Sequence, residues 1–463
     1  MISYMGCFPQ DASVISYIDC STWSGWEAEA SCQCGFLSVP ENHEDLTGKK
    51  IKIAFAIKNS GSNNEIPTII LTGGPGGAAL DNPRRLAYDD LQSIGDVILV
   101  DQRGMGYSDP LPNMSEETMN ILAADLNQEQ AQERMAKLMQ ETRTVLDQRG
   151  IQPDYYNTTQ SAQDFGLLLQ ALGYKQYNLW GASYGTKLAA YIMKHSPSRI
   201  HAAALSGLAR LDNMALYHRY PHFIQSLQGV FDRCNSDPSC QLIHGSLRSS
   251  LLKALELLDE HPVVLPMAGR DFTINPQDGL FLVRYMLYQS NALDLVSQFV
   301  KAVADNDVQG MRQSCSRALS VFSGVNISTF YSYNAYEEFS SNTESEIAAF
   351  VSRTDIYQPA MIGWFQSFIP ALNDWHHSRV SLEESALGSI DIPTLLVSNT
   401  HDPVTPPENV DHFKRVMTRY TIVQADLFGH VSFNPCITDI RRSFLKEPTR
   451  TLSDDCLQQL GRR

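Results

Sequence analysis

YNLWGASYGTKLAAYIMKH, residues 177–195, is the most informative segment of this 463-residue chain. A strand-like apolar run leads directly into Gly181-Ala182-Ser183-Tyr184-Gly185, and a helix-like run follows. This is the strand–turn–helix context that a G-x-S-x-G nucleophile elbow requires. The glycines permit a turn that strains the serine backbone, and the helix directs its positive end at the site. We therefore predict that Ser183 is a nucleophile.

Six further short apolar runs share the strand-like character of the run before Ser183. Their apolarity is continuous rather than alternating, which indicates strands covered on both faces. A mainly parallel sheet wrapped by helices has this property, so the predicted fold class is α/β. The runs are IKIAFAI (51–57), TIILT (68–72), DVILVD (96–101), HAAALSG (201–207), PTLLVSN (393–399) and TIVQA (421–425).

The spacing of these runs predicts the domain organisation. Between them, residues 208–390 are mostly helix-like, for example SLRSSLLKALELLDEH. An insertion that leaves and rejoins an α/β sheet lies over the carboxyl ends of the strands, where such sheets bind ligands. We therefore expect a helical lid over 208–390 between two core segments, 35–207 and 391–463. Residues 1–34 form a cysteine-containing extension, and 114–150 form a second helical excursion.

Composition excludes several classes of protein. Hydrophobic residues make up 43% of the chain, which is enough for a large core. Lys and Arg number 36 and Asp and Glu 51, a net charge of −15. Such a surface repels polyphosphate, which argues against nucleic acid as a partner, and it attracts cations such as free amines. No apolar run reaches about 18 residues, so we expect no transmembrane helix.

Nine cysteines indicate disulfides and export. One pair encloses a short polar loop, another brackets the C-terminal segment, and three cysteines gather near the N-terminus; these are Cys234 and Cys240, Cys436 and Cys456, and Cys20, Cys32 and Cys34. The spacings fit no usual zinc pattern, so no metal is expected. Because nine is odd, at least one thiol stays unpaired.

The compartment predicted from the cysteines is extracellular or periplasmic. The first residues lack the basic start and apolar stretch of a signal peptide, so an export signal would have been removed. Cys7, which follows Met-Gly, is a weaker candidate for lipid attachment.

A serine hydroxyl needs a base that a carboxylate orients. In the fold that carries this elbow, the chain order is serine, acid, histidine, with the last two in loops after late strands. Asp402 in THDPVTP and His430 in DLFGHVSF occupy such loops, after PTLLVSN and TIVQA. The competing residues are His401, Asp426 and the pair His376-His377. His401 adjoins the proposed acid, and Asp426 is too close to His430 in sequence to face it easily.

Acyl transfer also requires donors for the developing oxyanion. One should be the backbone N–H of Tyr184, directly after the nucleophile, and the other should come from an early strand-to-helix loop. TIILTGGPGGAA (68–79) fits that loop, and we select Gly74 as the second donor. A phosphate cradle is excluded because no G-K-[ST] follows.

Together these motifs resemble the proline iminopeptidase and tripeptidyl aminopeptidase family of α/β-hydrolases. The resemblance is carried by G-G-P-G-G after a strand, DQRGMGYSD (101–109), GASYGT, and the D-P-V-T-P and G-H loops. The stretch YYNTTQSAQDFGLLLQALG and the C-terminal cysteine pair are more similar to the secreted tripeptidyl-type members. The family implies cofactor-free hydrolysis near a free peptide N-terminus through an acyl-enzyme on Ser183, with the lid limiting substrate length.

The resemblance also implies that lid carboxylates bind the α-amino group of the substrate. SYNAYEEF resembles the acidic lid motif of the family, so Glu337 is the first candidate and Glu338 the second. This chain departs from the family pattern at Thr72, where His is usual, and at Tyr336, where relatives often carry Cys. Asp101 and Arg103 are expected to form an internal charge pair that shapes a turn.

Two alternative functions remain at this stage. An esterase or amidase acting on small acyl substrates shares the elbow and triad, and only the lid distinguishes it. A non-catalytic binding protein is disfavoured by the complete set of triad candidates. The preferred residue, the number of residues released, the oligomeric state and the disulfide connectivity do not follow from the sequence.

Overall fold

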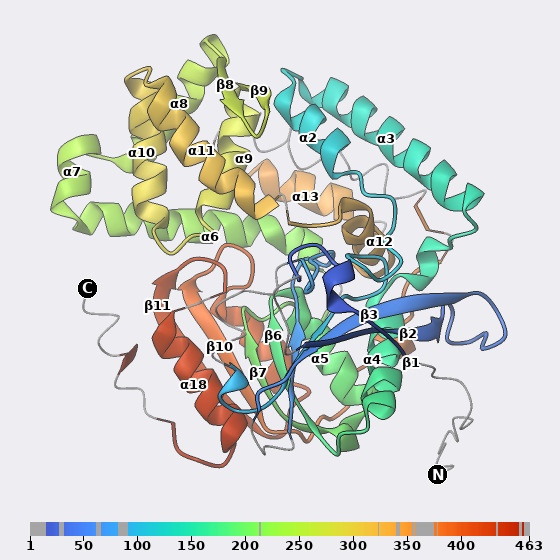
Figure 1. The fold of residues 1–463 in the computed structure, drawn as a ribbon. Helices are drawn as coiled ribbons and strands as arrows, with labels where there is room; N and C mark the ends of the chain where they lie inside the picture. The colour runs from blue at the N-terminus through green and yellow to red at the C-terminus, as the bar shows by residue number, and fades with distance from the viewer. Residues whose placement is uncertain are drawn as a thin grey trace.

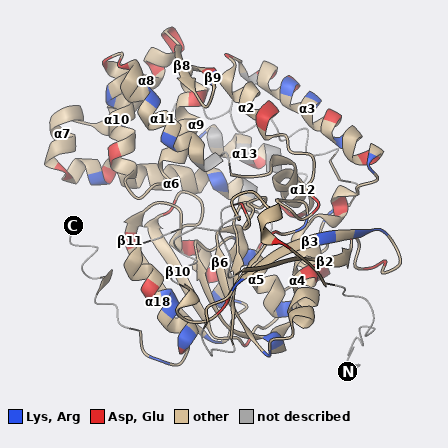
Figure 2. Cartoon of the chain, viewed as in Figure 1, with Lys and Arg blue, Asp and Glu red and all other residues tan. Residues whose placement is uncertain are grey.

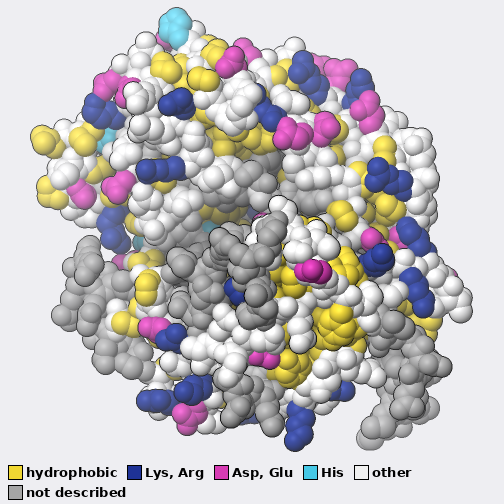
Figure 3. Space-filling model, viewed as in Figure 1, with side chains coloured by type: hydrophobic (Ala, Val, Ile, Leu, Met, Phe, Trp, Pro, Cys, Tyr) yellow, Lys and Arg dark blue, Asp and Glu magenta, His cyan; other side chains and the backbone are white. Residues whose placement is uncertain are grey.

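The computed structural model describes residues 15–26, 32–61, 66–81, 91–212, 214–322, 324–338, 343–353, 356, 375–376, 378–431, 434–452 and 456–457. These residues form a nine-stranded sheet flanked by helices, and a layer of helices covers one end of it (Figure 1). On the face shown in Figure 3, acidic and basic side chains are interspersed over both parts of the molecule.

The sheet has the strand order β1-β2-β3-β5-β4-β6-β7-β10-β11. Neighbouring strands are parallel from β5 to β11, whereas β1, β2, β3 and β5 pair antiparallel. The predicted α/β-hydrolase fold with a mainly parallel sheet is confirmed. The strands are β1 (Ile15–Ile18), β2 (Cys32–Pro40), β3 (Lys50–Lys58), β4 (Thr68–Leu71), β5 (Val97–Val100), β6 (Tyr177–Ala182), β7 (Ile200–Ser206), β10 (Thr394–His401) and β11 (Tyr420–Phe428).

The continuous apolarity of the strands has the predicted cause. Leu179 of β6 packs into one core with α4 (Thr158–Leu172) and α5 (Tyr184–His195), whereas Trp180 packs into a second core with α18 (Pro435–Lys446). Successive side chains of a strand point to opposite faces, so both faces of the sheet must be covered.

The upper layer contains the region predicted as a lid and also the second excursion, α2 (Ser115–Ala123) and α3 (Gln128–Gln148) (Figure 1). The lid region is not wholly helical, because β8 (Val263–Met267) and β9 (Arg270–Ile274) form an antiparallel hairpin. Its helices are α6 (Ala215–Ser236), α7 (Pro238–His244), α8 (Leu247–Glu260), α9 (Pro276–Met286), α10 (Ala292–Ala304), α11 (Val308–Phe322), α12 (Ile327–Glu337), α13 (Thr343–Val351) and α16 (Leu382–Ser385).

At the N-terminus, the sheet extends further than the sequence analysis expected. β2 runs across the boundary that the sequence analysis placed after residue 34, and β1 pairs with it, so both belong to the core sheet. The exact limits of the lid remain a prediction, because residues 357–374 lie outside the described residues.

Arg103 has a different partner from the one predicted. Its guanidinium makes two hydrogen bonds of 2.7 Å to the carboxylate of Asp164 on α4, and not to Asp101. Asp101 instead accepts backbone N–H groups from Ala79, Leu80 and Tyr107. The predicted Asp101–Arg103 pair is therefore wrong. Although Asp101 and Arg103 are two residues apart, their side chains point to different segments, Arg103 to α4 and Asp101 to the neighbouring loops.

Three disulfides join Cys20 to Cys34, Cys234 to Cys240 and Cys436 to Cys456. The two pairs proposed from sequence are confirmed, and the N-terminal cluster contributes the third. Disulfides of this number are typical of proteins from oxidising compartments. Cys7 lies outside the described residues. Within the described part of the chain, no helix is long and apolar enough to cross a bilayer.

The Arg103–Asp164 ion pair yields a stability prediction. We expect Asp164→Asn to lower the free energy of unfolding at pH 7 by about 3–5 kcal/mol, because it leaves a buried guanidinium uncompensated. Burial opposes ionisation, but Arg103 and His43 hold the pKa of Asp164 below its usual value. Because the pKa of Asp164 is lower in the folded state, the ionised carboxylate stabilises the fold at pH values above the unfolded-state pKa near 4. This stabilisation is lost as the pH falls through the folded-state pKa.

Urea unfolding from pH 7 to pH 3 measures both effects. The wild-type stability should fall more steeply below about pH 4 than that of Asp164→Asn. Asp411→Asn, which removes an exposed pair with Lys414, is the matched control and should leave the free energy of unfolding almost unchanged, because solvent screens the pair. Equal effects of the two substitutions would contradict the assignment.

Candidate active site

Ser183 stands at the turn between β6 and α5 with φ 55° and ψ −126°. This left-handed backbone is rare for a residue with a side chain, and it is the strain predicted for the elbow. A Cβ on Gly185 would lie 2.1 Å from the Leu71 carbonyl oxygen, and one on Gly181 would lie 2.9 Å from the Gly185 oxygen. Both glycines are therefore required by close backbone approach.

The three residues predicted as a triad form one chain of hydrogen bonds. His430 Nε2 lies 2.7 Å from Ser183 Oγ, and His430 Nδ1 lies 2.9 and 3.0 Å from the two oxygens of Asp402. Asp402 follows β10 and His430 follows β11, which are parallel neighbours, so their carboxyl ends bring both residues to Ser183. This arrangement allows Nδ1–H to donate to the carboxylate while Nε2 accepts the serine proton.

Asp402 is held as an anion inside the protein. Only 1% of its surface is exposed. Burial raises its pKa, but the interaction with His430 and hydrogen bonds from Thr405 outweigh burial and lower the pKa below its usual value. The backbone N–H groups of Val404 and Thr405 each donate to Oδ1 at 2.8 Å. A carboxylate so placed stays charged and fixes the imidazole tautomer.

Thr405 is a contact that sequence reasoning missed. Its hydroxyl donates to Asp402 Oδ2 at 2.7 Å and lies 3.2 Å from His430 Nδ1. The spacing Asp402-x-x-Thr405 was the available signal, because a side chain three residues on can fold back onto a carboxylate in a turn.

The glycine-rich loop lies against the elbow. A Cβ on Gly73 would lie 2.9 Å from the Ser183 Cβ. Thr72, where the family usually has His, donates its hydroxyl to the Gly77 carbonyl at 2.6 Å and so braces the loop. The predicted oxyanion donors are the N–H groups of Gly74 and Tyr184. Gly74 follows Gly73 in the loop that contacts Ser183, and Tyr184 directly follows Ser183 in the chain. Their role stays a prediction.

A lid residue covers the imidazole. The Tyr288 ring packs edge-on against the His430 ring with centroids 5.2 Å apart. The backbone carbonyl of Tyr288 accepts the backbone N–H of His430 at 3.0 Å. Gly429, with φ 96°, permits this approach, because a Cβ there would lie 3.1 Å from the Tyr288 carbonyl oxygen.

Glu337 and Glu338 end α12 and are 7% and 6% exposed. Glu337 accepts the N–H of Thr158 at 2.5 Å and its hydroxyl at 2.9 Å. Glu338 accepts the N–H of Ala215 at 2.8 Å. Lys187 Nζ contacts both carboxylates, at 2.9 and 2.5 Å. The structure therefore gives both residues internal partners, which the sequence did not reveal, and binding of a substrate amine stays a prediction.

The competing residues from the sequence analysis lie in other contacts. His401 pairs with Asp426 at 3.3 Å and stacks on Phe428. His376 contacts Asp154 at 2.8 Å. His377 lies outside the described residues.

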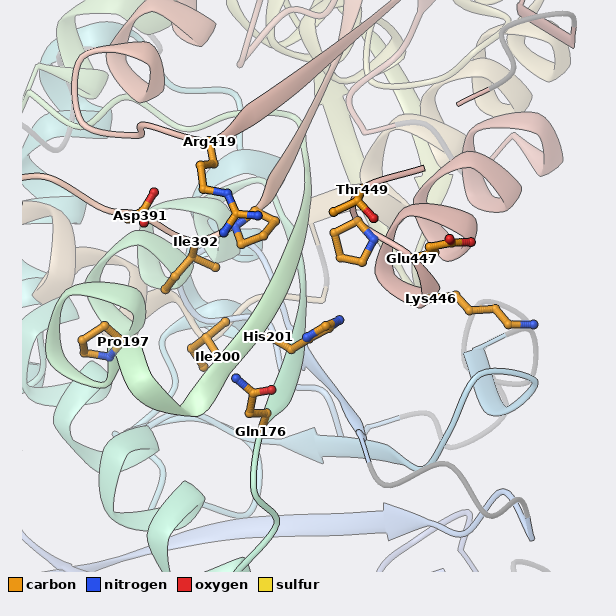
Figure 4. A pocket seen from close by; sticks show the side chains of 12 residues that line it. Gln176, Pro197, Ile200, His201, Asp391, Ile392, Arg419, Lys446, Glu447 and Thr449 are labelled. Atoms are coloured by element: carbon orange, nitrogen blue, oxygen red, sulfur yellow. The ribbon is translucent and has the colours of Figure 1, made fainter. Parts of the chain in front are cut away.

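A cavity of about 550 Å³ lies at the opposite edge of the sheet (Figure 4). Its lining includes Gln176, Ile200, Pro393 and Arg419, which stand at or just before the amino ends of β6, β7, β10 and β11. Ligands of open α/β sheets bind at the carboxyl ends, so this cavity is separate from the Ser183 site.

Comparison with known protein families agrees with this geometry. Residues 67–238 match the family model described as alpha/beta hydrolase fold, and residues 369–456 match the model described as TAP-like protein. The chain belongs to the tripeptidyl aminopeptidase-like α/β-hydrolases. The first match contains the glycine-rich loop and Ser183, and the second contains Asp402 and His430.

Relatives of this α/β-hydrolase are similar over different lengths. Escherichia coli K12 YuaR is 25% identical over 437 residues, which cover 86% of this chain and 83% of YuaR. Tripeptidyl aminopeptidase of Streptomyces lividans is 29% identical over 190 residues, 38% of this chain and 35% of that protein. This chain thus matches about a third of the length of that aminopeptidase.

Solved structures also align with this α/β-hydrolase. Serine hydrolase CCSP0084 from Cycloclasticus zankles is 12% identical with a TM-score of 0.39, covering 90% of this chain and 100% of that one. A mutant of the meta-cleavage product hydrolase CumD is 13% identical with a TM-score of 0.37, covering 86% of this chain and 94% of that one.

The contacts of Thr405 generate a testable prediction. We expect Thr405→Val to slow labelling of Ser183 by a neutral fluorophosphonate about tenfold, because the charged Asp402 loses one hydrogen bond. Stopped-time labelling followed by mass spectrometry measures the rate. Thr400→Val, which removes a hydroxyl of β10 that donates to the Ala425 carbonyl of β11, is the control and should label at the wild-type rate. Identical rates for both variants would disprove the role of Thr405.

Proposed function

We propose that this α/β-hydrolase is a serine exopeptidase that cleaves peptide bonds near a free N-terminus through an acyl-enzyme on Ser183. The observation that carries the proposal is the unbroken hydrogen-bond chain from Ser183 Oγ through His430 to the buried Asp402. Such a chain supplies a nucleophile, a base and an orienting carboxylate in contact.

In the proposed reaction, Ser183 Oγ attacks the peptide carbonyl and His430 Nε2 takes its proton. The N–H groups of Gly74 and Tyr184 stabilise the oxyanion. The C–N bond then breaks as His430 returns the proton to the leaving amine, and Ser183 keeps the acyl group. Water, deprotonated by His430, attacks the ester, releases the acyl fragment as a carboxylic acid and restores the serine.

The proposed site for the substrate ammonium is the cluster of Glu337, Glu338 and Lys187. One lysine faces two carboxylates, so the cluster keeps a net charge of −1 when all three are ionised. Negative potential near a weakly hydrated site favours an ammonium ion. α12, whose C-terminal end carries both carboxylates, is capped at its N-terminus by Asn326, whose N–H donates to the Gly76 carbonyl of the glycine-rich loop at 2.9 Å. A single helix therefore links the proposed oxyanion and ammonium sites.

The second candidate function is an esterase or amidase of the same fold. The feature that favours it is the internal pairing of both glutamates, which an enzyme indifferent to an ammonium would also tolerate. For either activity, the three disulfides support an extracellular or periplasmic location.

The decisive experiment compares short peptides with their Nα-acetylated forms. We expect acetylation to lower kcat/KM about 10- to 100-fold, since it removes the charge that the acidic cluster binds. Ser183→Ala should lower kcat at least about 10⁴-fold and serves as the blank. Equal rates on free and acetylated substrates would favour the esterase.

The role of Glu337 is tested by the same substrate pair. Glu337→Gln should narrow the difference between free and acetylated peptides, because the cluster loses its net negative charge. Glu256→Gln, which removes an exposed carboxylate from α8, is the control and should leave the difference unchanged. Full retention of the difference in Glu337→Gln would assign amine binding elsewhere.

A further inference from the structure

Arg219 on α6 is a cation beside the proposed active site that no part of the mechanism uses. Its guanidinium lies 4.8 Å above the Phe330 ring and 3.4 Å from Asn334 Oδ1, both on α12. Among the described residues, no carboxylate lies within ion-pair distance of it. A half-buried arginine held by an aromatic ring and an amide oxygen keeps most of its donors available to a ligand.

A second guanidinium reinforces the positive charge. Arg284 on α9 is 3% exposed, donates to the Tyr288 hydroxyl at 3.3 Å and lies over the rings of Tyr285 and Tyr288. Burial and the charge of Arg284 lower the pKa of Arg219. The like charge of Arg284 disfavours the ionised form of Arg219, and a bound anion would relieve that repulsion.

The two arginines are connected to the catalytic histidine through Tyr288. The same ring that accepts from Arg284 packs on the His430 ring. In acyl transfer the histidine protonates the leaving amine, so the leaving fragment must lie beside the imidazole. The space on this side of His430 is therefore bounded by Tyr288, whose hydroxyl accepts from Arg284.

Half-buried residues outline access to this side of the site. Ser183, His430, Tyr288, Phe330 and Arg219 all retain part of their solvent-exposed surface. They come from the elbow, the histidine loop, the segment after α9, α12 and α6, so solvent reaches the nucleophile, the imidazole and the guanidinium.

We propose that Arg219, supported by Arg284, binds a carboxylate carried by the leaving fragment of the substrate. The ligand class is a carboxylate because a planar guanidinium matches its two oxygens and because peptide fragments end in one. The proposal deepens the proposed peptidase function and rests on it for the identity of the leaving fragment. It implies a preference for short peptides with a free C-terminus or an acidic side chain after the scissile bond.

The test compares three peptides. Two share one sequence, with Gln after the scissile bond, and end in a free acid or an amide. The third is an amide with Glu in place of that Gln. We expect wild type to prefer the free acid or the Glu peptide over the plain amide about 10- to 100-fold in kcat/KM. Preference for the first identifies the C-terminal carboxylate and preference for the second the side chain. No preference for either overturns the proposal.

The variant Arg219→Gln should lose this preference, with its kcat/KM falling on the acidic peptides far more than on the plain amide. Arg233→Gln on the same helix, where the guanidinium pairs with the exposed Asp426, is the control and should keep the preference. Asn334→Asp provides a second variant that keeps Arg219 but supplies a competing carboxylate, and it should also lose the preference. An equal fall of Arg219→Gln on all three peptides would indicate a structural role and overturn the proposal.

A binding measurement separates this proposal from the peptidase proposal. The free acid should protect Ser183 from a neutral fluorophosphonate better than the amide does, and Arg219→Gln should remove the difference. This readout needs no cleavage, so it holds even if the enzyme proves to be an esterase. Equal protection by acid and amide in the wild type would contradict carboxylate binding.

Discussion

The ionised carboxylate of Asp402 is the interaction on which the proposed site depends. Burial alone would raise its pKa, and a neutral acid could not hold His430 in the tautomer that accepts the serine proton. Two backbone N–H groups and the Thr405 hydroxyl supply hydrogen bonds that water would otherwise make. The sheet makes this possible, because β10 and β11 end side by side and the elbow of β6 presents Ser183 to the same edge. The fold thus supplies hydrogen bonds that offset the loss of hydration of the buried Asp402 carboxylate.

Sequence reasoning predicted the parts of the fold that local pattern controls. The continuous apolar runs predicted seven strands, and the inner ones are buried on both faces, as Leu179 and Trp180 illustrate. β11, at the edge of the sheet, is apolar in sequence but mostly exposed. The edge strand β1 and its neighbour β2 carry polar and cysteine residues and were missed as strands. The elbow was predictable because its glycines are required by contacts within a few residues of Ser183 and by the neighbouring strand.

Long-range pairing was less predictable. Arg103 was assigned to Asp101, two residues away, yet it pairs with Asp164, which α4 brings to it across the core. Glu337 and Glu338 were predicted as substrate ligands, but Lys187 of α5 and Thr158 of α4 reach them through tertiary packing. These partners lie more than 60 residues apart in sequence, so no local pattern identifies them.

Charged residues are arranged differently over the molecule as a whole and in the active-site region. Figure 2 shows acidic and basic residues scattered over the helices, consistent with a chain whose net charge of −15 has no single focus in this view. Around Ser183 the charges are instead ordered, with an acidic cluster at the end of α12 and two arginines towards Tyr288. Under the proposed function, these charges would orient a bound peptide, since its two ends carry opposite charges.

The most direct measurement is a crystal structure of the enzyme after reaction with a fluorophosphonate. We predict a single phosphonyl adduct on Ser183 Oγ, with its phosphoryl oxygen about 3 Å from the backbone nitrogens of both Gly74 and Tyr184. His430 should remain hydrogen-bonded to Asp402. An adduct on another residue, or a phosphoryl oxygen turned away from both nitrogens, would contradict this prediction.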